Sequence, residues 1–248
     1  RAAHTGPRPA AAARAGHPLP PVRRVLADRL RTWQVATAQL TVTAEADVTA
    51  LGGVVGTGGD GGTPYLAAVV RACALTLADH PLLGTRWVDD RLVEPGAIDI
   101  GVAVALEGSL VAPVVRGAEG RPVGALHWEV TELAERARAG TLTIPELHGA
   151  VFTVTNLGAY GIDAFTPLLD PPQTAILGLG QARLRPAVVD GRIEPRMLMV
   201  LSLTVDHQVI DGVPAAAFLA DVIARLEHPA TLLPAPGRHS LPGKEVSP

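Results

Sequence analysis

Apolar and polar residues follow two different periods along the chain, and these periods predict an ordered series of helices and strands. Four segments carry apolar residues at helical spacing, which predicts helices at 22–33, 64–80, 123–139 and 213–227. Other segments are apolar runs or alternate apolar with polar residues, which predicts strands at 39–48, 98–106, 110–115, 150–155, 174–180, 184–190 and 197–205. A large sheet with covering helices follows, so we expect an α+β or mixed α/β fold.

Three local patterns refine this series. Asp89 and Asp90 lie between two apolar arms, which indicates a β-hairpin over 87–93. The runs at 98–106 and 110–115 are almost continuously apolar, so we expect strands that are buried on both faces. The glycine-rich stretch 52–62 is interpreted as a connector, because the Lys-Ser/Thr pair of a phosphate-binding loop does not follow it.

The two ends of the chain differ in composition from the region between them. Residues 1–21 are dominated by Ala, Pro, Arg and Gly, which predicts a flexible arm or linker. We expect residues 234–248 to form a disordered tail, which leaves one folded domain over 22–233. No apolar stretch reaches the roughly 20 residues of a membrane helix, and the start has no signal-peptide core. We expect a soluble, cytoplasmic protein.

Composition restricts the chemistry further. Hydrophobic residues make up 48% of the chain and aromatic residues only 3%, so the core must be built from Ala, Val and Leu. The formal net charge of −3 gives no electrostatic reason to expect nucleic acid or an anionic membrane as a partner. Cys73 is the single cysteine, which excludes an intramolecular disulfide, and no Cys/His cluster has zinc-ligand spacing. We expect no metal site and a buried, inert Cys73.

The main candidate for chemistry is the end of the strand predicted at 197–205. This apolar run leads into Asp206 and His207, with Asp211 close behind, so ionisable side chains lie in a turn that a rigid strand positions. A histidine there can act as a general base, because its unperturbed pKa of about 6.5 leaves it able to accept a proton near neutral pH. The alternative is a surface turn with a structural histidine.

Two other enzyme classes fit the sequence less well. A serine hydrolase is disfavoured because the chain has no G-x-S-x-G motif and Ser202 lies inside a predicted strand. A zinc enzyme is disfavoured because His207 has no second histidine four residues further on.

The residues around His207 resemble a known family signature. The run from Asp206 to Gly212, DHQVIDG, resembles the DHRxxDG motif that closes the catalytic domain of dihydrolipoamide acyltransferases and is shared by chloramphenicol acetyltransferases. Upstream, four pieces resemble that family's FTISNLG…FTP…PP…AILG series, namely Phe152–Gly158, Phe165–Pro167, Pro171-Pro172 and Ala175–Gly178. The resemblance covers roughly residues 22–233. It implies an acyltransferase domain with the chloramphenicol acetyltransferase fold, an α+β (mixed α/β) two-layer sandwich of a large mixed sheet and covering helices.

The resemblance also implies roles for single residues. His207 matches the family's catalytic base, and Thr155 matches the hydroxyl that stabilises the tetrahedral oxyanion. Asp211 matches an aspartate that holds the loop by an ion pair, expected here with an arginine of the opening helix. Without the resemblance, Thr155 is an ordinary strand threonine and Asp211 a turn former.

Substrate contacts are expected on either side of these residues. The implied substrate is coenzyme A or acyl-CoA, and we expect Asn156 and Gly158 on its side of the site. The acceptor, a small molecule or a dihydrolipoyl group, is expected in a pocket lined by Phe165, Leu169 and the start of the chain after Pro21.

One position departs from the family motif, and one family property concerns assembly. Gln208 replaces the usual arginine, which puts partner recognition or loop anchoring in doubt more than catalysis. In the family the histidine and the hydroxyl come from neighbouring subunits. The resemblance therefore implies a homotrimer, or a larger core built from trimers.

Three functional classes stay open. We favour a stand-alone enzyme that uses acyl-CoA to acetylate a small-molecule hydroxyl, as in tetronate-type secondary metabolism, because the chain carries neither a lipoyl domain nor its attachment site. The alternative is the core acyltransferase of a 2-oxoacid dehydrogenase complex, which the Ala/Pro-rich start favours. A silent scaffold is disfavoured because His207 and Thr155 are both in place.

Overall fold

The computed structural model describes residues 18–55 and 63–233. The expected tail at 234–248, most of the expected arm at 1–21 and most of the glycine-rich connector lie outside the described residues. The described start of that connector forms a short helix, α2 (Gly52–Val55).

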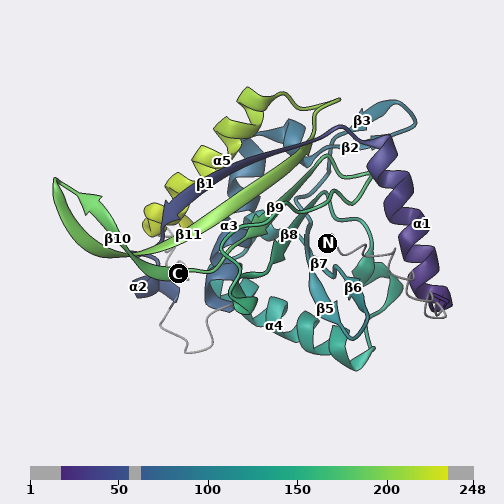
Figure 1. Cartoon of the computed structure of the whole chain (residues 1–248), viewed down its shortest axis with the longest axis horizontal. Helices are drawn as coiled ribbons and strands as arrows, with labels where there is room; N and C mark the ends of the chain where they lie inside the picture. The colour runs from purple at the N-terminus through teal and green to yellow at the C-terminus, as the bar shows by residue number, and fades with distance from the viewer. Residues whose placement is uncertain (1–17, 56–62, 234–248) are drawn as a thin grey trace, which may run out of the picture.

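The centre of the domain is a seven-stranded mixed sheet in the order β1, β11, β9, β8, β4, β7, with β10 paired to β11 (Figure 1). Its strands are β1 (Gln39–Asp47), β4 (Ile100–Val102), β7 (Val114–Val115), β8 (Phe152–Asn156), β9 (Ala175–Leu179), β10 (Arg183–Val189) and β11 (Arg192–Asp206). The β4–β8 and β8–β9 pairs are parallel, whereas β11 runs antiparallel to both of its neighbours β1 and β9.

Helices cover one face of this sheet. Helix α5 packs on β1 and β11, and α3 packs against both α4 and α5. Their bounds are α3 (Thr63–Asp79), α4 (Val123–Ala139) and α5 (Gly212–Glu227). Helix α1 (Pro21–Ala36) lies at the outer edge of the molecule, beside a hairpin of β2 (Arg86–Val88) and β3 (Arg91–Val93) (Figure 1). Short 3-10 turns occur at 81–84, 118–120, 144–147, 158–160 and 229–232.

The two faces of the sheet have different chemistry because side chains alternate along each strand. On the helix side, alternate residues of β11 join the hydrophobic core: Met199, Leu201, Leu203 and Val205. On the other side the same strand carries hydroxyls. Ser202 is hydrogen bonded to Thr43 at 3.3 Å, and the Thr204 hydroxyl lies 2.8 Å from that of Thr41. The core therefore lies between the sheet and its helices.

The observed architecture confirms the predicted α+β class, the four long helices and the hairpin over 87–93. Asp89 and Asp90 both have positive φ, at 49° and 57°, as the tight hairpin turn requires. Gly140 ends α4 in the left-handed conformation. Cys73 is fully buried, and burial raises the pKa of its thiol.

The prediction for 98–106 and 110–115 was partly wrong. Only β4 and β7 lie in the buried sheet, whereas β5 (Val104–Leu106) and β6 (Ser109–Val111) form a separate hairpin. Gly108 has φ of 75° and makes the turn, and Leu110 is 59% exposed. Apolar content alone did not show that the chain turns away from the sheet here.

An aromatic contact joins the sheet to its helix layer and gives a stability test. The rings of Phe152 in β8 and Phe218 in α5 are both fully buried, with centroids 5.6 Å apart. We expect Phe218→Ala to lower the free energy of unfolding by about 3–5 kcal/mol through lost burial and a cavity. Trp128→Ala is the control, because Trp128 is 77% exposed, and its effect should stay within about 0.5 kcal/mol. Urea unfolding at one fixed protein concentration measures both, and equal losses would contradict this assignment.

Candidate active site

His207 lies where β11 ends and the chain turns into α5, as the sequence predicts. Its backbone N–H donates to the Ala38 carbonyl at 2.8 Å, which extends the β1–β11 ladder by one bond. The imidazole side chain is 46% exposed, and its Nδ1 lies 3.5 Å from a carboxylate oxygen of Asp211. The backbone of His207 is therefore fixed at the strand end, and its Nε2 has no hydrogen-bond partner among the described residues.

The buried carboxylate of Asp206 holds this turn in place. Asp206 is 3% exposed, and its Oδ1 accepts hydrogen bonds from the backbone N–H groups of Ala38 at 3.2 Å and Gln208 at 3.1 Å. The side-chain amide of Gln208 donates to the same oxygen at 3.1 Å and to the Ala36 carbonyl at 2.9 Å. These bonds tie the turn that carries His207 to the segment that follows α1.

This arrangement changes two expectations about the turn. Gln208 does anchor the loop, although it lacks the charge of the arginine that the family motif carries. Asp211 has no arginine partner among the described residues and is 84% exposed. In helix α1, Arg29 instead forms an ion pair with Asp170, with 3.7 Å between a guanidinium nitrogen and a carboxylate oxygen. The turn is therefore anchored by Asp206. The sequence analysis did not assign this role to Asp206, although it stands directly before His207.

Thr155 lies near the end of β8, and its neighbours shape a tight turn. The Oδ1 of Asn156 accepts from the Gly158 N–H at 2.8 Å, which closes a side-chain turn just after the strand. A Cβ on residue 158 would lie 2.8 Å from the carbonyl carbon of Gly180, so backbone packing explains the glycine. The Thr155 hydroxyl has no hydrogen-bond partner among the described residues and is half-buried. It is available as a donor.

One chain does not bring Thr155 and His207 together. Thr155 pairs with Gly178 on β9, and Gly178 pairs with Ser202 on β11. His207 lies five residues beyond Ser202, so the two positions are separated by about 17 Å along the strands and about 10 Å across them. They stand at opposite ends of the sheet, a separation that no side-chain rotation closes.

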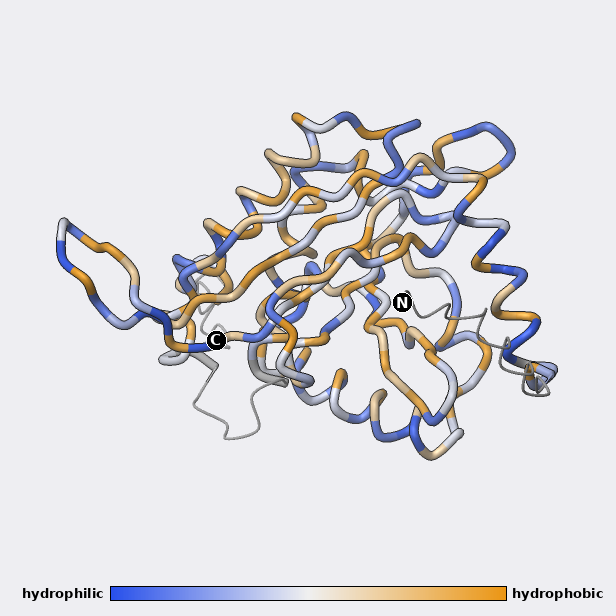
Figure 2. Tube along the Cα trace, in the orientation of Figure 1, coloured by the Kyte–Doolittle hydropathy of each residue, from blue (hydrophilic) through white to orange (hydrophobic). Residues whose placement is uncertain are grey.

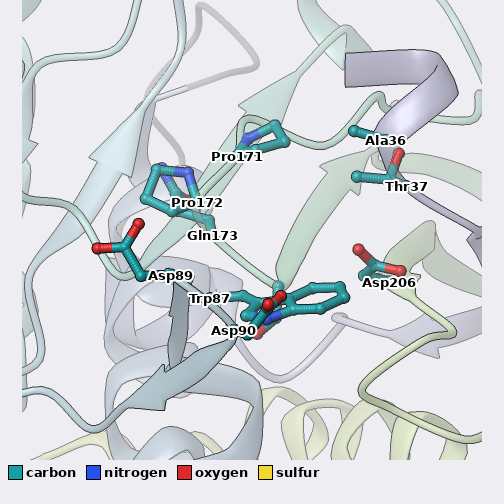
Figure 3. A pocket seen from close by; sticks show the side chains of 10 residues that line it. Ala36, Thr37, Trp87, Asp89, Asp90, Pro171, Pro172, Gln173 and Asp206 are labelled. Atoms are coloured by element: carbon teal, nitrogen blue, oxygen red, sulfur yellow. The ribbon is translucent and has the colours of Figure 1, made fainter. Parts of the chain in front are cut away.

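A cavity of about 320 Å³ lies beside the His207 turn (Figure 3). Its lining comes from the end of α1, the β2–β3 hairpin, the 171–174 segment and the strand end: Ala36, Thr37, Trp87, Asp89, Asp90, Pro171, Pro172, Gln173, Thr174 and Asp206. Figure 3 shows the Trp87 ring and the carboxylates of Asp90 and Asp206 around the same space. The cavity thus combines an apolar wall with acidic groups.

The lining differs from the expected acceptor pocket. The chain after Pro21 contributes, through the end of α1, but neither Phe165 nor Leu169 does. Leu169 is 1% exposed, and its backbone N–H donates to the Gln39 side chain at 3.2 Å. Phe165 lies over Gly178, beside Thr155, where a Cβ on residue 178 would come within 2.9 Å of its ring.

Asp170, the partner of Arg29, is a carboxyl with a shifted pKa. Burial raises the pKa of this carboxyl above its usual range, while Arg29 and His148 oppose the rise. Within residues 18–55 and 63–233, no group of three or more His, Cys, Asp or Glu side chains could hold a metal ion. Over the same residues, no helix combines the length and apolar character needed to cross a membrane.

Comparison with known proteins gives the same family that the sequence motifs resemble. The family model for the catalytic domain of 2-oxoacid dehydrogenase acyltransferases matches residues 12–234. The acetyltransferase component of the acetoin cleaving system of Bacillus subtilis is 39% identical over 223 residues, which are 87% of this chain and 56% of that protein. The chain therefore spans about half the length of this relative.

Solved structures agree with this result. The dihydrolipoamide acetyltransferase of Azotobacter vinelandii superposes with a TM-score of 0.80 at 28% identity, covering 92% of this chain and 99% of that one. A cubic core of the pyruvate dehydrogenase multienzyme complex superposes with a TM-score of 0.80 at 29% identity, over 92% and 99% of the two chains.

The hydrogen bonds of Gln208 lead to a testable prediction about how well ordered the 206–211 turn is. Gln208→Ala removes the side-chain bonds to Ala36 and Asp206, each worth about 0.5–1.5 kcal/mol. We therefore expect faster amide hydrogen exchange in the 206–211 turn, by roughly tenfold, with unchanged exchange in α3. Gln34→Ala is the control, because Gln34 is exposed on α1 and bonds only to the Gln39 side chain, at 3.4 Å. Equal exchange in the two variants would show that Gln208 does not hold the turn.

Proposed function

Because the chain belongs to the 2-oxoacid dehydrogenase acyltransferase family, we propose that it transfers an acyl group between a dihydrolipoyl thiol and coenzyme A. The observation that carries this proposal is the position of His207, fixed by its backbone at a strand end with an exposed imidazole. A relative gives independent support for the residues involved.

The structure of the Azotobacter vinelandii enzyme belongs to a study of a serine, a histidine and an asparagine in its catalytic mechanism. In that protein the serine stands 52 positions before the histidine, and the asparagine stands 4 positions after it. Thr155 and Asp211 stand at the same two intervals from His207 in this chain. These intervals support Thr155 and Asp211 as its partners in the site.

The reaction assigned to these residues is the transfer of an acyl group from one thiol to another, with general-base catalysis. The His207 imidazole removes the proton from the thiol of coenzyme A, and the sulfur attacks the carbonyl carbon of the acylated dihydrolipoyl group. The Thr155 hydroxyl donates a hydrogen bond to the resulting oxyanion. When the carbon–sulfur bond to the dihydrolipoyl group breaks, its thiolate takes the proton back from His207. Asp211 accepts from the Nδ1 side and keeps the other nitrogen directed at the thiol.

Substrate placement follows from the two ends of the sheet. Asn156 and Gly158 are proposed on the coenzyme A side because they flank Thr155, and Phe165 lies next to the same position. The dihydrolipoyl group is proposed at the cavity between the end of α1 and the β2–β3 hairpin, next to the His207 turn.

The site is proposed to be completed by a second copy of the chain. His207 and Thr155 of one copy are too far apart to act together, so each must meet the other residue on a neighbour. Contacts that use two different patches close into a ring when the rotation between successive copies closes. A cubic core has threefold axes through its corners, and such a core is built by a similar chain. We therefore propose a trimer as the smallest active unit.

Membership of a multienzyme complex is favoured over the stand-alone enzyme expected from the sequence. The similar proteins are components of an acetoin cleaving system and of pyruvate dehydrogenase complexes, and no comparison supports a secondary-metabolite enzyme.

We expect free dihydrolipoamide to be acetylated from acetyl-CoA at least about tenfold faster than simple alcohols, because the proposed reaction transfers the acyl group between two thiols. Initial rates with both acceptor classes test this, and faster turnover of an alcohol would restore the stand-alone interpretation.

Three substitutions test the catalytic roles. His207→Ala removes the base and should lower the acetyl-CoA to dihydrolipoamide rate by about 10²–10⁴-fold, with circular dichroism unchanged. Thr155→Val should lower the rate less, and Thr155→Ser should stay near wild type because the hydroxyl remains. A His207→Ala enzyme within a few-fold of wild type would remove the histidine from the mechanism. Equal rates for the Val and Ser variants would remove the hydroxyl.

A mixing experiment tests whether the site is shared. Co-expression of His207→Ala chains with Thr155→Val chains creates some interfaces that carry both wild-type residues, one from each copy. Random trimers should restore roughly a quarter of wild-type activity. The control is co-expression of chains carrying both substitutions with chains carrying His207→Ala alone, which leaves no intact site. A mixture no more active than its separate components would contradict a site between copies.

A further inference from the structure

The cavity beside the His207 turn combines an apolar wall with negative charge. Trp87, Pro171 and Pro172 supply the apolar wall of this space of about 320 Å³. None of the residues that line it, all of which lie in the described part of the chain, is Lys, Arg or His. Arg86 does not line it, because side chains alternate along a strand and Arg86 directly precedes Trp87 in β2. The cavity can therefore hold a hydrocarbon chain, but it offers no positive partner to an anion.

Two of the lining carboxylates, Asp89 and Asp90, form the turn of the β2–β3 hairpin. The backbone N–H of Trp87 donates to the Pro172 carbonyl at 2.8 Å, which ties this hairpin to a second wall of the cavity. Figure 3 shows the Asp90 carboxylate beside the Trp87 ring. Figure 2 shows the tip of the hairpin as hydrophilic. The hairpin therefore holds two negative charges at the cavity.

The third lining carboxylate, Asp206, lies next to the proposed base, because it directly precedes His207. Asp206 is 3% exposed, and the groups that donate hydrogen bonds to it are backbone N–H groups and the Gln208 amide, which are neutral. Within residues 18–55 and 63–233, neither Asp206 nor the two hairpin aspartates form an ion pair with a cation. The negative charge of the cavity is therefore not compensated by a positive side chain.

An anionic group in this cavity meets like charges and loses part of its water. A single like charge roughly 8 Å away weakens binding by about fivefold at the intermediate dielectric constant of a protein surface. Removal from water adds to this penalty when no positive partner replaces the water. An uncharged group avoids both penalties, and the apolar wall favours it.

We propose that Asp89, Asp90 and Asp206 make this site selective for uncharged acyl groups, such as acetyl, over dicarboxylic ones, such as succinyl. This inference rests on the proposed function, which places the acylated dihydrolipoyl group at this cavity, and it adds the class of acyl group. The thioester lies at His207 during transfer. A carboxylate at the far end of a succinyl chain would therefore enter the field of the three aspartates.

The test compares two acyl-CoA donors of the same shape and different charge. Succinyl-CoA ends in a carboxylate, whereas 4-methylpentanoyl-CoA carries two methyl groups in place of the two carboxylate oxygens. With either donor, the acyl carbon loses its bond to the sulfur of coenzyme A and gains a bond to a sulfur of dihydrolipoamide. The proton of the dihydrolipoamide thiol passes to the thiolate of coenzyme A. The ratio of the two kcat/KM values therefore reports the effect of the acyl charge.

We expect the wild type to use 4-methylpentanoyl-CoA with a kcat/KM at least about tenfold above that for succinyl-CoA. The double variant Asp89→Asn with Asp90→Asn removes two charges from the cavity and should lower this ratio at least about threefold. Asparagine suits the positive φ of both positions, 49° and 57°, so the turn is retained.

The control is Asp190→Asn, which makes the same change of charge in the same backbone conformation. Asp190 has φ of 49° and lies in the turn between β10 and β11, at the opposite end of the molecule from the β2–β3 hairpin (Figure 1). The control should keep the wild-type ratio. A similar fall of the ratio in the control would overturn the proposal, because net charge alone would then explain the effect.

Salt gives a second readout that needs no substitution. Raising the salt concentration from about 0.05 M to about 0.5 M should narrow the ratio of the wild type, because salt screens the exposed hairpin carboxylates. It should narrow the ratio of the double variant less. If the double variant fails to fold, Asp90→Asn alone should lower the ratio by about twofold. Wild-type ratios in the variants, or a wild-type ratio that salt does not change, would overturn the proposal.

Failure of the proposed function would look different from failure of this inference. A wild type that transfers neither acyl group to dihydrolipoamide, and does not transfer acetyl, would contradict the proposed function. A wild type that transfers acetyl and uses succinyl-CoA as well as 4-methylpentanoyl-CoA would leave that function in place and overturn only the selection by charge.

Discussion

The strict two-residue alternation of β11 is the constraint on which the other features depend. From Arg192 to Asp206 the strand keeps one register with its partners, and its helix-side residues are apolar throughout. A slip of one residue would move the core side chains to the hydroxyl-rich face and the serine and threonine side chains into the core. The same alternation fixes where Asp206 and His207 emerge.

Strand direction then determines what one copy of the chain can do. Because β8 is parallel to β9 while β11 is antiparallel to it, residues at the carboxyl ends of β8 and β11 stand at opposite ends of the sheet. Thr155 and His207 are such residues. A fold of this topology can unite them only between copies, so the proposed chemistry and the proposed assembly depend on each other.

The features that follow from local periodicity could be predicted from the sequence, and those set by tertiary contacts could not. The helices, the hairpin at Asp89 and Asp90, and the strand that ends at His207 all have local patterns. The separate β5–β6 hairpin was missed because an apolar run does not reveal which sheet it joins. Leu169 was expected to line a pocket, but it is buried, and its backbone N–H bonds to Gln39, which is 130 positions away. Long-range bonds of this kind leave no trace in local composition.

The Gln208 substitution shows how the turn can be anchored without an added charge. A buried carboxylate such as Asp206 is costly unless its oxygens accept hydrogen bonds. Here two backbone N–H groups and the Gln208 amide supply them, and the same amide reaches the Ala36 carbonyl. These bonds are directional and lie partly out of solvent, so dissolved salt screens them less than it would an exposed ion pair. The amide therefore positions the backbone of His207 by geometry, which is what a proton transfer at its imidazole requires.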